Sequence, residues 1–226
     1  MDVVEHEQPL AASRPRSAGR GPGRARAEKL ARILDAAEEE FALAGLRGAR
    51  VQRIADRAGL PKANVLYYFR SKTAIYRALL TELVEDWNAF LAGIRVEDDP
   101  AVVLDALVRA KVDLAWARPR ASKLFAQEII AGAPVIGEAL RGPIRRLFRA
   151  RTSVVRRWID DGRMAPVDPD LLLFLIWSST QHYADFDEQV RALSGRRRYD
   201  DALRRRVADF LSHAVLATCG LVHAHD

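Results

Sequence analysis

The apolar residues of this chain recur at helical spacing from Ala27 onwards, and prolines and glycines separate one helical pattern from the next. No stretch alternates apolar and polar residues for long enough to predict a sheet, and no repeat of solenoid period is present. The pattern therefore predicts an all-α fold with three short helices in front and a series of longer ones behind. The longer helices are expected over 72–92, 101–117, 120–131, 135–161, 169–192 and 200–221.

Charge divides the chain into two unequal parts. Residues 13–72 contain 14 lysines and arginines against 6 acidic residues, whereas residues 73–226 contain 22 against 21. A basic front on a near-neutral body indicates a polyanionic partner, either nucleic acid or an anionic membrane surface, although a solubilising surface would have the same charge. Residues 1–24 are rich in proline, glycine and arginine, and this composition predicts a flexible basic arm.

Composition favours a cytoplasmic protein. Cys219 is the only cysteine, which excludes an internal disulfide framework. The first residues lack the basic and apolar regions of a secretory signal. The longest uncharged runs, 171–184 and 210–224, are shorter than the ~20 apolar residues that a membrane-spanning helix needs. We therefore expect neither secretion nor insertion into a membrane.

Residues 51–69 have the pattern of a helix-turn-helix. Two short helical segments are joined by Gly59-Leu60-Pro61, and the glycine can adopt the positive φ that a tight turn requires. The small side chain of Ala55 allows the two helices to approach closely. The apolar residues that we expect to face inward are Ile54, Ala55, Ala58, Val65, Leu66 and Phe69.

The second helix of this motif has an outward face suited to the major groove of DNA. Its outward residues are Lys62, Ala63, Asn64, Tyr67 and Tyr68. They combine an ammonium group, a small apolar side chain, an amide that can pair with adenine and phenols that can reach phosphates. Lys72, at the start of the next helix, can meet a phosphate through its ammonium group and through free backbone N–H groups nearby.

Several short motifs lie at fixed distances from one another between Phe41 and Leu80. They are the Gly45/Gly48 turn, Ile54-Ala55, Ala58-Gly59, Leu66-Tyr67-Tyr68-Phe69 and Ser71-Lys72. In these elements the chain resembles the N-terminal domain of TetR-family transcriptional regulators. It departs from the family at Ala49, where Thr or Ser is usual, and this difference removes a predicted helix N-cap.

The resemblance implies a homodimer that binds a pseudo-palindromic DNA operator, with one recognition helix in each half-site, and that responds to a small-molecule effector. It divides the chain into a helix-turn-helix DNA-binding domain over 25–71 and an effector-binding and dimerisation domain over 72–226. We expect the dimer interface in the last two helical patterns, 169–192 and 200–221. Their apolar faces would look the same in a purely intramolecular core, so periodicity leaves both readings open.

One apolar helical segment carries two residues suited to a flat polar ligand. Trp177 and Gln181 lie four residues apart and therefore share a helix face. A buried amide needs a partner, which another protein group or a water can provide. In the functional alternative, the amide pairs with the adjacent N–H and C=O of a ring such as uracil or thymine, which lies against the flat face of Trp177.

A second resemblance bears on the effector. The segments 121–140 and 160–186 resemble TetR-family members that respond to uracil or thymine. This resemblance implies that Trp177 and Gln181 contact the pyrimidine and that Trp87 closes the pocket from the other side. Lys111 and Glu128 are weaker candidates, for which an ion pair or a surface position is the simpler account. No metal or cofactor is implied beyond the effector itself.

Other functions remain open at this stage. A regulator with a different small aromatic or apolar effector is the alternative within the family. An enzyme could use His182, Asp185 and Ser178 or Ser179, but no GxSxG, HExxH or Walker pattern accompanies them. A peripheral membrane protein would account for the basic arm but not for the helix-turn-helix.

Overall fold

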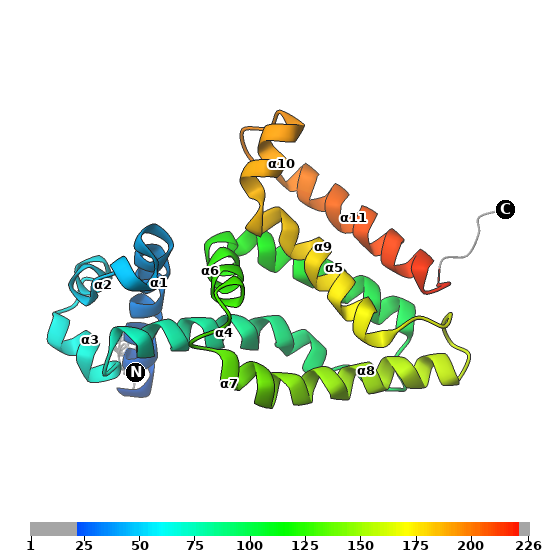
Figure 1. Ribbon diagram of the computed structural model, residues 1–226, viewed down its shortest axis with the longest axis horizontal. Coiled ribbons are helices and arrows are strands. Elements are labelled where there is room, and N and C mark those ends of the chain that lie inside the picture. Colours follow the sequence, from blue (N-terminus) through cyan, green and yellow to red (C-terminus); the bar gives the residue numbers. More distant parts are fainter. Residues whose placement is uncertain (1–21, 222–226) are drawn as a thin grey trace, which may run out of the picture.

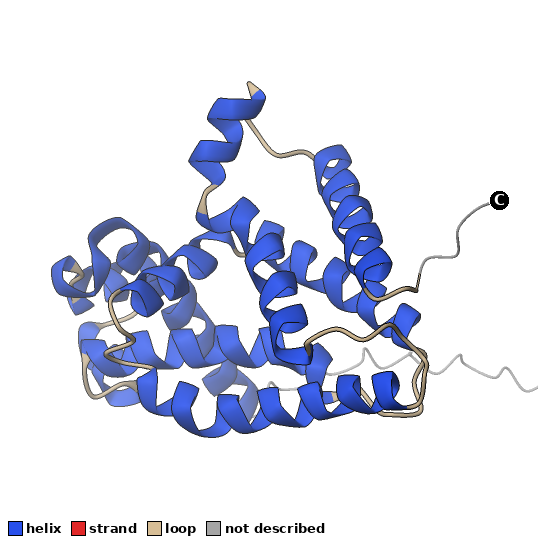
Figure 2. Cartoon of the chain, turned by 45° about the vertical axis from the view of Figure 1, so that its right-hand side comes forward, coloured by secondary structure: helices blue, strands red, loops and turns tan. Residues whose placement is uncertain are grey.

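The computed structural model describes residues 22–221, and all regular secondary structure in this range is helical (Figures 1 and 2), as the sequence predicts. The front of the chain forms α1 (Pro22–Gly48), α2 (Val51–Ala58) and α3 (Lys62–Tyr68). The body contains α4 (Lys72–Ala92), α5 (Pro100–Ala117), α6 (Pro119–Ile130), α7 (Gly137–Ala139), the π-helical turn η1 (Leu140–Ile144), α8 (Arg145–Asp160), α9 (Pro169–Asp185), α10 (Asp187–Ser194) and α11 (Asp201–Thr218).

The first helix begins earlier than the sequence predicts. We expected helix from Ala27 and a flexible arm over 1–24, but α1 starts at Pro22, so residues 22–24 are helical. Proline is favoured in a first helical turn, and an ion pair of 3.5 Å between Arg24 and Glu28 supports this turn. The remainder of the expected arm, residues 1–21, lies outside the described residues.

Two of the predicted long helices are interrupted. The pattern over 135–161 is broken at Gly142, whose φ of −103° and ψ of −105° are not helical, and Pro143 follows it directly. The pattern over 169–192 divides at Phe186, which has a φ of −117° and a ψ of 32° and separates α9 from α10. Apolar periodicity continues across both breaks, so it did not reveal them.

The chain has two main hydrophobic cores, and α4 contributes to both. The first core joins α1, α2, α3 and the first half of α4, with Phe41, Ile54 and Val65 fully buried. The second core joins the end of α4 with α5, α8, α9 and α11, around Trp158 and Ile176. Figure 1 shows α4 running from the three front helices into the body. A shift of α4 would therefore move the front helices relative to the body.

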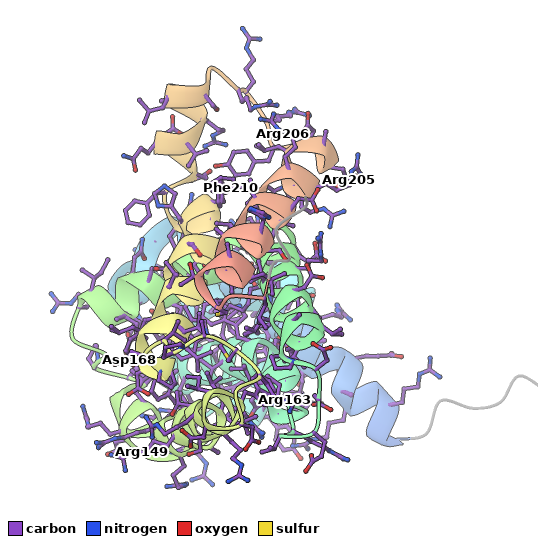
Figure 3. The ribbon with its side chains drawn as sticks, turned by 90° about the vertical axis from the view of Figure 1, so that its right-hand side faces the viewer. Arg149, Arg163, Asp168, Arg205, Arg206 and Phe210 are labelled. Atoms are coloured by element: carbon purple, nitrogen blue, oxygen red, sulfur yellow. The ribbon has the colours of Figure 1, made fainter. Side chains whose placement is uncertain are left out.

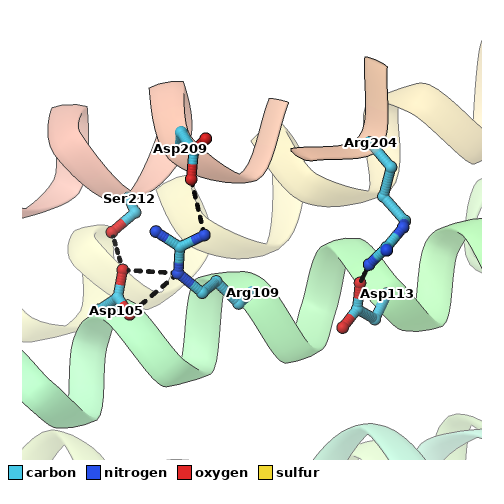
Figure 4. Close-up of polar contacts among 6 residues, drawn as sticks. All are labelled: Asp105, Arg109, Asp113, Arg204, Asp209 and Ser212. Carbon is cyan, nitrogen blue, oxygen red and sulfur yellow. Dashed lines mark hydrogen bonds and ion pairs between the residues drawn. The ribbon is translucent and has the colours of Figure 1, made fainter. Parts of the chain in front are cut away.

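Polar contacts fasten α11 to α5 along the outer side of the body (Figure 4). The guanidinium group of Arg109 pairs with Asp105 at 2.9 Å and with Asp209 of α11 at 2.7 Å. Ser212 of α11 donates a hydrogen bond to Asp105, and Arg204 pairs with Asp113. These polar contacts and the apolar packing of Val207, Leu211 and Val215 together hold α11 on α5. The opposite face of α11 therefore points outward. 

A cluster of ion pairs joins the front of the chain to the body. Arg118, between α5 and α6, lies 3.1 Å from Glu38 of α1. The same guanidinium group lies 3.0 Å from Glu82 and 2.8 Å from Asp86, both on α4. We call Arg118, Glu38, Glu82 and Asp86 the Arg118 cluster. A single side chain thus ties α1, α4 and α6 together.

The turn between α2 and α3 has the geometry expected of a helix-turn-helix. Gly59 is left-handed, with a φ of 60° and a ψ of 39°. A Cβ at this position would lie 2.9 Å from a guanidinium nitrogen of Arg32, which donates to the backbone oxygens of Ala58 and Gly59. Backbone conformation and space therefore both favour glycine here.

We predict that Gly59→Ala lowers the free energy of unfolding by about 1–2 kcal/mol, because an L-residue is disfavoured in the left-handed region and the new methyl group crowds Arg32. Urea unfolding measures this. The control is Gly23→Ala in α1, where φ is not positive and no atom lies within 4 Å of the added Cβ, so stability should be kept or slightly raised. Equal stability of the wild type and Gly59→Ala would contradict the prediction.

Candidate DNA-binding surface and effector site

The outer face of α3 is open to solvent and chemically mixed. Lys62, Ala63 and Asn64 are exposed, and Tyr67 is 76% exposed. Val65 is fully buried in the first core and anchors the helix from below. The structure thus places four of the five predicted outward residues on the surface of a short helix that is held by its inner face.

Two predictions about α3 need correction. Leu66 was expected to face inward but is 38% exposed, because successive helical residues lie about 100° apart and Val65 already occupies the inward position. Tyr68 was expected to face outward but is half-buried, with its ring 5.3 Å from the guanidinium carbon of Arg26 and packed edge-on against Tyr67. The side chain of Tyr68 therefore braces α3 against α1.

The ammonium group of Lys72 is engaged within the protein. It donates to the backbone oxygens of Arg47 and Ala49, each at 2.9 Å. The nearby hydroxyl group of Ser71 accepts from the N–H of Ala74 at 3.1 Å and caps α4. Lys72 thus joins the end of α1 to the start of α4, a structural contact that the sequence did not reveal.

The missing N-cap of α2 is replaced by a buried carboxylate. No side chain caps this helix at Arg50, in agreement with the prediction made from Ala49. Instead, the backbone N–H of Arg50 donates to Glu40 at 3.2 Å, and Glu40 is almost fully buried. Arg53 and Arg57 lie 3.9 Å and 3.7 Å from the same carboxylate. The front of α2 is therefore held by α1 rather than by its own cap.

Trp87 lies at the meeting point of α4, α5 and α6. It is buried and packs edge-on against Phe125 of α6, with ring centroids 4.8 Å apart. The ammonium nitrogen of Lys111, on α5, lies 4.3 Å from the centroid of the Trp87 ring. Trp87, a predicted ligand residue, therefore contacts Lys111, which we expected on the surface or in an ion pair.

Lys111 is only 3% exposed, and no hydrogen bond or ion pair joins its ammonium group to any of the side chains that the structure describes. Burial lowers its pKa to about 7, and the charge of Asp185 on α9 opposes part of that shift. Burial likewise raises the pKa of Asp185, against a hydrogen bond of 2.5 Å from Ser122 and the charges of Lys111 and Lys123. Lys111 and Asp185 therefore act on each other through their charges, without a hydrogen bond between them.

Gln181 lies one helical turn before Asp185 on α9 and one turn after Trp177, so all three residues share one side of the helix. Gln181 is half-buried, and no residue in the described part of the chain accepts from or donates to its amide. Trp177 instead packs against Phe148 of α8 at 5.6 Å. Lys111 thus lies against Trp87 and is affected by the charge of Asp185 on α9, but among the described residues no ring contact or hydrogen bond joins Trp87 to Trp177 or Gln181.

Trp177 also lines an open groove of about 340 Å³ between α8 and α9. The groove is lined by the aromatic residues Phe148, Phe174 and Trp177, the aliphatic residues Leu140 and Ile144, and the charged residues Arg145, Arg149 and Asp170. The rings of Phe148 and Phe174 are stacked 5.2 Å apart. A flat ring could enter here independently of Trp87.

Two other candidates are used within the fold. Glu128 is buried and accepts from the backbone N–H groups of Val135 at 2.5 Å and of Ile136 at 3.0 Å, so it is neither on the surface nor in an ion pair but holds the turn before α7. Ser178 and Ser179 both donate to the backbone oxygen of Leu175, while His182 stacks on Phe186 at the surface. The alternative of a Ser–His–Asp triad on α9 therefore has no structural basis.

The outer faces of α9 and α11 expose large apolar side chains. On α9 these are Leu171, Phe174 and Leu175, and on α11 Phe210 is 69% exposed. Figure 3 views α11 from the side on which Phe210, Arg205 and Arg206 lie. Clustered apolar exposure of this kind is typical of surfaces that bind another protein. No described helix is both long and apolar enough to cross a bilayer, and the described residues contain no group of metal ligands.

These features define a helix-turn-helix regulator, and comparison with known proteins identifies the family. Residues 33–79 match the family "Bacterial regulatory proteins, tetR family", and residues 80–222 match "YcdC-like protein, C-terminal region". The chain therefore belongs to the TetR family of transcriptional regulators. The members it matches are regulators, which favours gene regulation over an enzymatic function.

Individual relatives agree with this assignment. The chain is 36% identical over 193 residues to the HTH-type transcriptional regulator RutR of Escherichia coli K12, which covers 85% of this chain and 91% of RutR. RutR of Shigella flexneri matches to the same extent. Among solved structures, SCO4942 from Streptomyces coelicolor, described as a transcriptional regulator, superposes with a TM-score of 0.66 at 27% identity over 85% of this chain and 98% of that one. A Clostridium perfringens protein shares the fold, with a TM-score of 0.63 at 19% identity over 86% of this chain and all of that one.

The burial of Lys111 predicts a pH dependence of stability. Because its pKa falls to about 7 in the folded protein but is 10.5 when unperturbed, the unfolded chain binds more protons between these values, and folding becomes more favourable as pH rises. Lys111→Met lacks this linkage. Between pH 7 and pH 9 the wild type should gain about 2 kcal/mol of stability relative to Lys111→Met in chemical unfolding. Parallel stability curves for the two proteins would contradict this.

Proposed function

We propose that this protein is a ligand-responsive TetR-type regulator that binds a pseudo-palindromic operator as a homodimer and is released from DNA by a pyrimidine such as uracil or thymine. Repression is the expected effect on transcription. The main support for DNA binding is the exposed outer face of α3. This helix belongs to a helix-turn-helix whose turn contains a left-handed glycine, Gly59.

In the proposed complex, α3 enters the major groove. Asn64 offers an amide that can pair with adenine, and Lys62 an ammonium group for a guanine or a phosphate. Ala63 can contact a thymine methyl group, and Tyr67 can reach the phosphate backbone. Tyr68 braces the helix, and Lys72 contributes its charge and remaining N–H hydrogen near a phosphate at the start of α4.

A homodimer provides the second recognition helix. One seven-residue helix makes few base contacts, so two-fold symmetry is needed to reach useful specificity. The apolar outer faces of α9 and α11 support a four-helix interface between the two copies. The contacts between α5 and α11 shown in Figure 4 hold α11 in place on its own protomer and leave Phe210 available to the partner.

The pyrimidine assignment rests on the resemblance of segments 121–140 and 160–186 to uracil- and thymine-responsive members of the family. Two observations support it: the half-buried amide of Gln181 has no hydrogen-bond partner among the described residues, and the ring of Trp87 is buried. An amide pairs well with the adjacent N–H and C=O of a pyrimidine edge, and indole rings offer flat apolar contact. The aromatic groove at Trp177 supports the second candidate, a different small aromatic effector bound between α8 and α9.

The Arg118 cluster offers a route from the effector to DNA. Trp87 directly follows Asp86 on α4, and Phe125 lies on α6, which begins just after Arg118. A ligand that displaces Trp87 or Phe125 would therefore shift the carboxylates that hold Arg118 against Glu38 of α1. Since one dimer geometry fits the operator better than another, a differential affinity of about 1–3 kcal/mol would change DNA binding by roughly 5- to 150-fold.

The first prediction of this proposal concerns base readout. With an operator selected from a pool of random duplexes, Asn64→Ala should weaken binding to the selected sequence by about 1–3 kcal/mol and leave binding to a random duplex nearly unchanged. Lys62→Ala should weaken binding to both sequences if its main contact is a phosphate. The control is Gln189→Ala, which removes an exposed amide on α10. Unaltered sequence preference in Asn64→Ala would argue against α3 as the reading helix.

The second prediction concerns assembly. Sedimentation equilibrium should show a dimer for the wild type and a monomer for Phe210→Asp, because a buried carboxylate without a partner disfavours the interface. Leu43→Asp is the matched control, since Leu43 is similarly exposed but lies on α1. A wild-type monomer, or a dimer that persists in Phe210→Asp and dissociates in Leu43→Asp, would remove α11 from the interface.

The third prediction concerns the effector. In a thermal-shift screen, uracil or thymine should stabilise the wild type, and Gln181→Ala should lose about 1–3 kcal/mol of the ligand's binding free energy. Gln127→Ala on α6 removes an exposed amide and should behave as the wild type. Stabilisation only by apolar aromatic compounds, lost on Phe148→Ala but kept in Gln181→Ala, would favour the groove at Trp177 instead.

A further inference from the structure

The outer side of α8 carries charge of a single sign. From Ala139 to Ile159 the chain contains seven arginines and no acidic residue, whereas the rest of residues 73–226 contains 15 lysines and arginines against 21 acidic residues. The near-neutral charge of the body therefore conceals one strongly basic helix. The exposed residues of α8 before its last residue, Asp160, are Arg145, Arg146, Arg149, Ala150, Ser153, Arg156 and Arg157. We call the five arginines in this set the arginine face of α8.

Most of the arginine face has no partner within the protein. Arg157 pairs with Asp161 at 3.1 Å, but the other four arginines form no ion pair with a carboxylate of residues 22–221. Arg151, on the inner side of α8, is different, because it donates to the backbone oxygens of Ile94 at 2.8 Å and of Ala92 at 2.9 Å. The fold thus uses Arg151 to hold α8 in place, and the packing of the helix does not account for the arginines outside.

The spacing of these arginines opposes helix stability. Arg145 and Arg149 lie four residues apart, and Arg156 follows seven residues after Arg149, so all three share one side of α8. Like charges four residues apart on a helix repel and destabilise it. No acidic side chain on this face offsets the repulsion before Asp160, at the end of the helix. A polyanion bound from outside would offset it.

The chemistry of the arginine face favours a nucleic acid over a membrane or a protein. Each guanidinium group presents parallel N–H donors that match the oxygens of a phosphate. A helix that lies on a membrane inserts large apolar side chains, and a protein interface usually has an apolar centre. Of the large apolar side chains exposed within residues 22–221, none lies between Ala139 and Ile159. The face therefore offers contacts to phosphates and little else.

The arginine face also lies apart from α3 and from the exposed side of α11. Figure 1 shows α3 at the left end of the molecule and α8 along the lower edge, running away from α3. Figure 3 shows Arg149 low on the molecule and Phe210 high on it. The helix is firmly held, since Trp158 is fully buried and its indole N–H donates to the backbone oxygen of Val96 at 2.7 Å. The face is thus a fixed surface, separate from the reading helix.

We propose that the arginine face of α8 is a second, sequence-independent DNA-binding surface, which holds the phosphate backbone of a duplex segment other than the operator read by α3. The 16 residues of α8 span about 24 Å, which is long enough to meet several phosphates of one duplex. A dimer on its operator would thereby hold a second stretch of DNA beside it. This role goes beyond the proposed function, because it needs neither base readout nor an effector.

The test asks whether operator-bound protein captures a second duplex. Protein saturated with a short biotinylated operator, selected from random duplexes, is immobilised on streptavidin and titrated with a fluorescent duplex of random sequence. The wild type should capture the second duplex, and capture should weaken steeply as salt rises, because each phosphate contact releases counterions. In Arg146→Gln/Arg156→Gln, capture at low salt should weaken by at least about 10-fold, and the salt slope should fall by about 2.

The matched control is Arg197→Gln/Arg198→Gln, which removes two exposed arginines before α11 and changes the net charge equally. It should capture the second duplex as the wild type does, and all three proteins should bind the operator equally. No capture by the wild type at low salt, or equal capture by the two double variants, would overturn the proposal. Binding of wild type to phosphatidylglycerol vesicles without capture of DNA would also overturn it, in favour of a membrane surface.

The second surface can be tested independently of the operator. If selection yields no operator, the proposed function fails, and the free proteins are titrated directly with the random duplex. Arg146→Gln/Arg156→Gln should then bind this duplex more weakly than Arg197→Gln/Arg198→Gln does, with the smaller salt slope. Equal affinities of the two variants would overturn the role of α8 in this arm as well.

Discussion

The structure depends on one shared helix. The first half of α4 belongs to the core of the DNA-binding domain, and its second half carries Trp87 and reaches the core of the body. The Arg118 cluster reinforces this link, because one guanidinium group binds carboxylates on α1 and α4 from the start of α6. Partly buried ion pairs with several partners are more geometrically specific than isolated surface pairs, and losing one partner leaves a charge without compensation. The three front helices are therefore joined to the region around Trp87 by one continuous helix and one set of ion pairs.

Sequence patterns predicted the DNA-binding end of the molecule in detail. The glycine turn, the buried Val65 and the exposed Lys62, Asn64 and Tyr67 all follow from local rules of helix periodicity and backbone conformation. The two errors in this domain concern α3, which is only two turns long. So short a helix buries a single line of side chains, here at Val65, and this leaves Leu66 exposed and Tyr68 half-buried. The engagement of Lys72 by backbone oxygens of residues 47 and 49 depends on a long-range contact, which no local pattern encodes.

The effector end was harder to predict for a physical reason. A lysine in an apolar helix looks the same in sequence whether it reaches the surface or is buried, and only the packing of α4, α6 and α9 around α5 determines which. The spacing of Trp177, Gln181 and Asp185 at successive turns of α9 was the available signal that these three residues share one side of the helix. The break at Gly142 is local, because Pro143 follows it directly, and the continuous apolar pattern hid it; the break at Phe186 has no glycine or proline to mark it in the sequence. The sequence could not predict which polar side chains have hydrogen-bond partners within the protein.

In the proposed mechanism, effector and operator compete for one dimer, so each must lower the affinity of the other by the same factor. Uracil affinity would be measured by fluorescence titration with and without saturating operator, and operator affinity with and without saturating uracil. We expect the same factor in both directions, and a smaller factor in Arg118→Ala if the cluster transmits the change. Equal affinity of uracil for the free dimer and for the operator-bound dimer would rule out this competition.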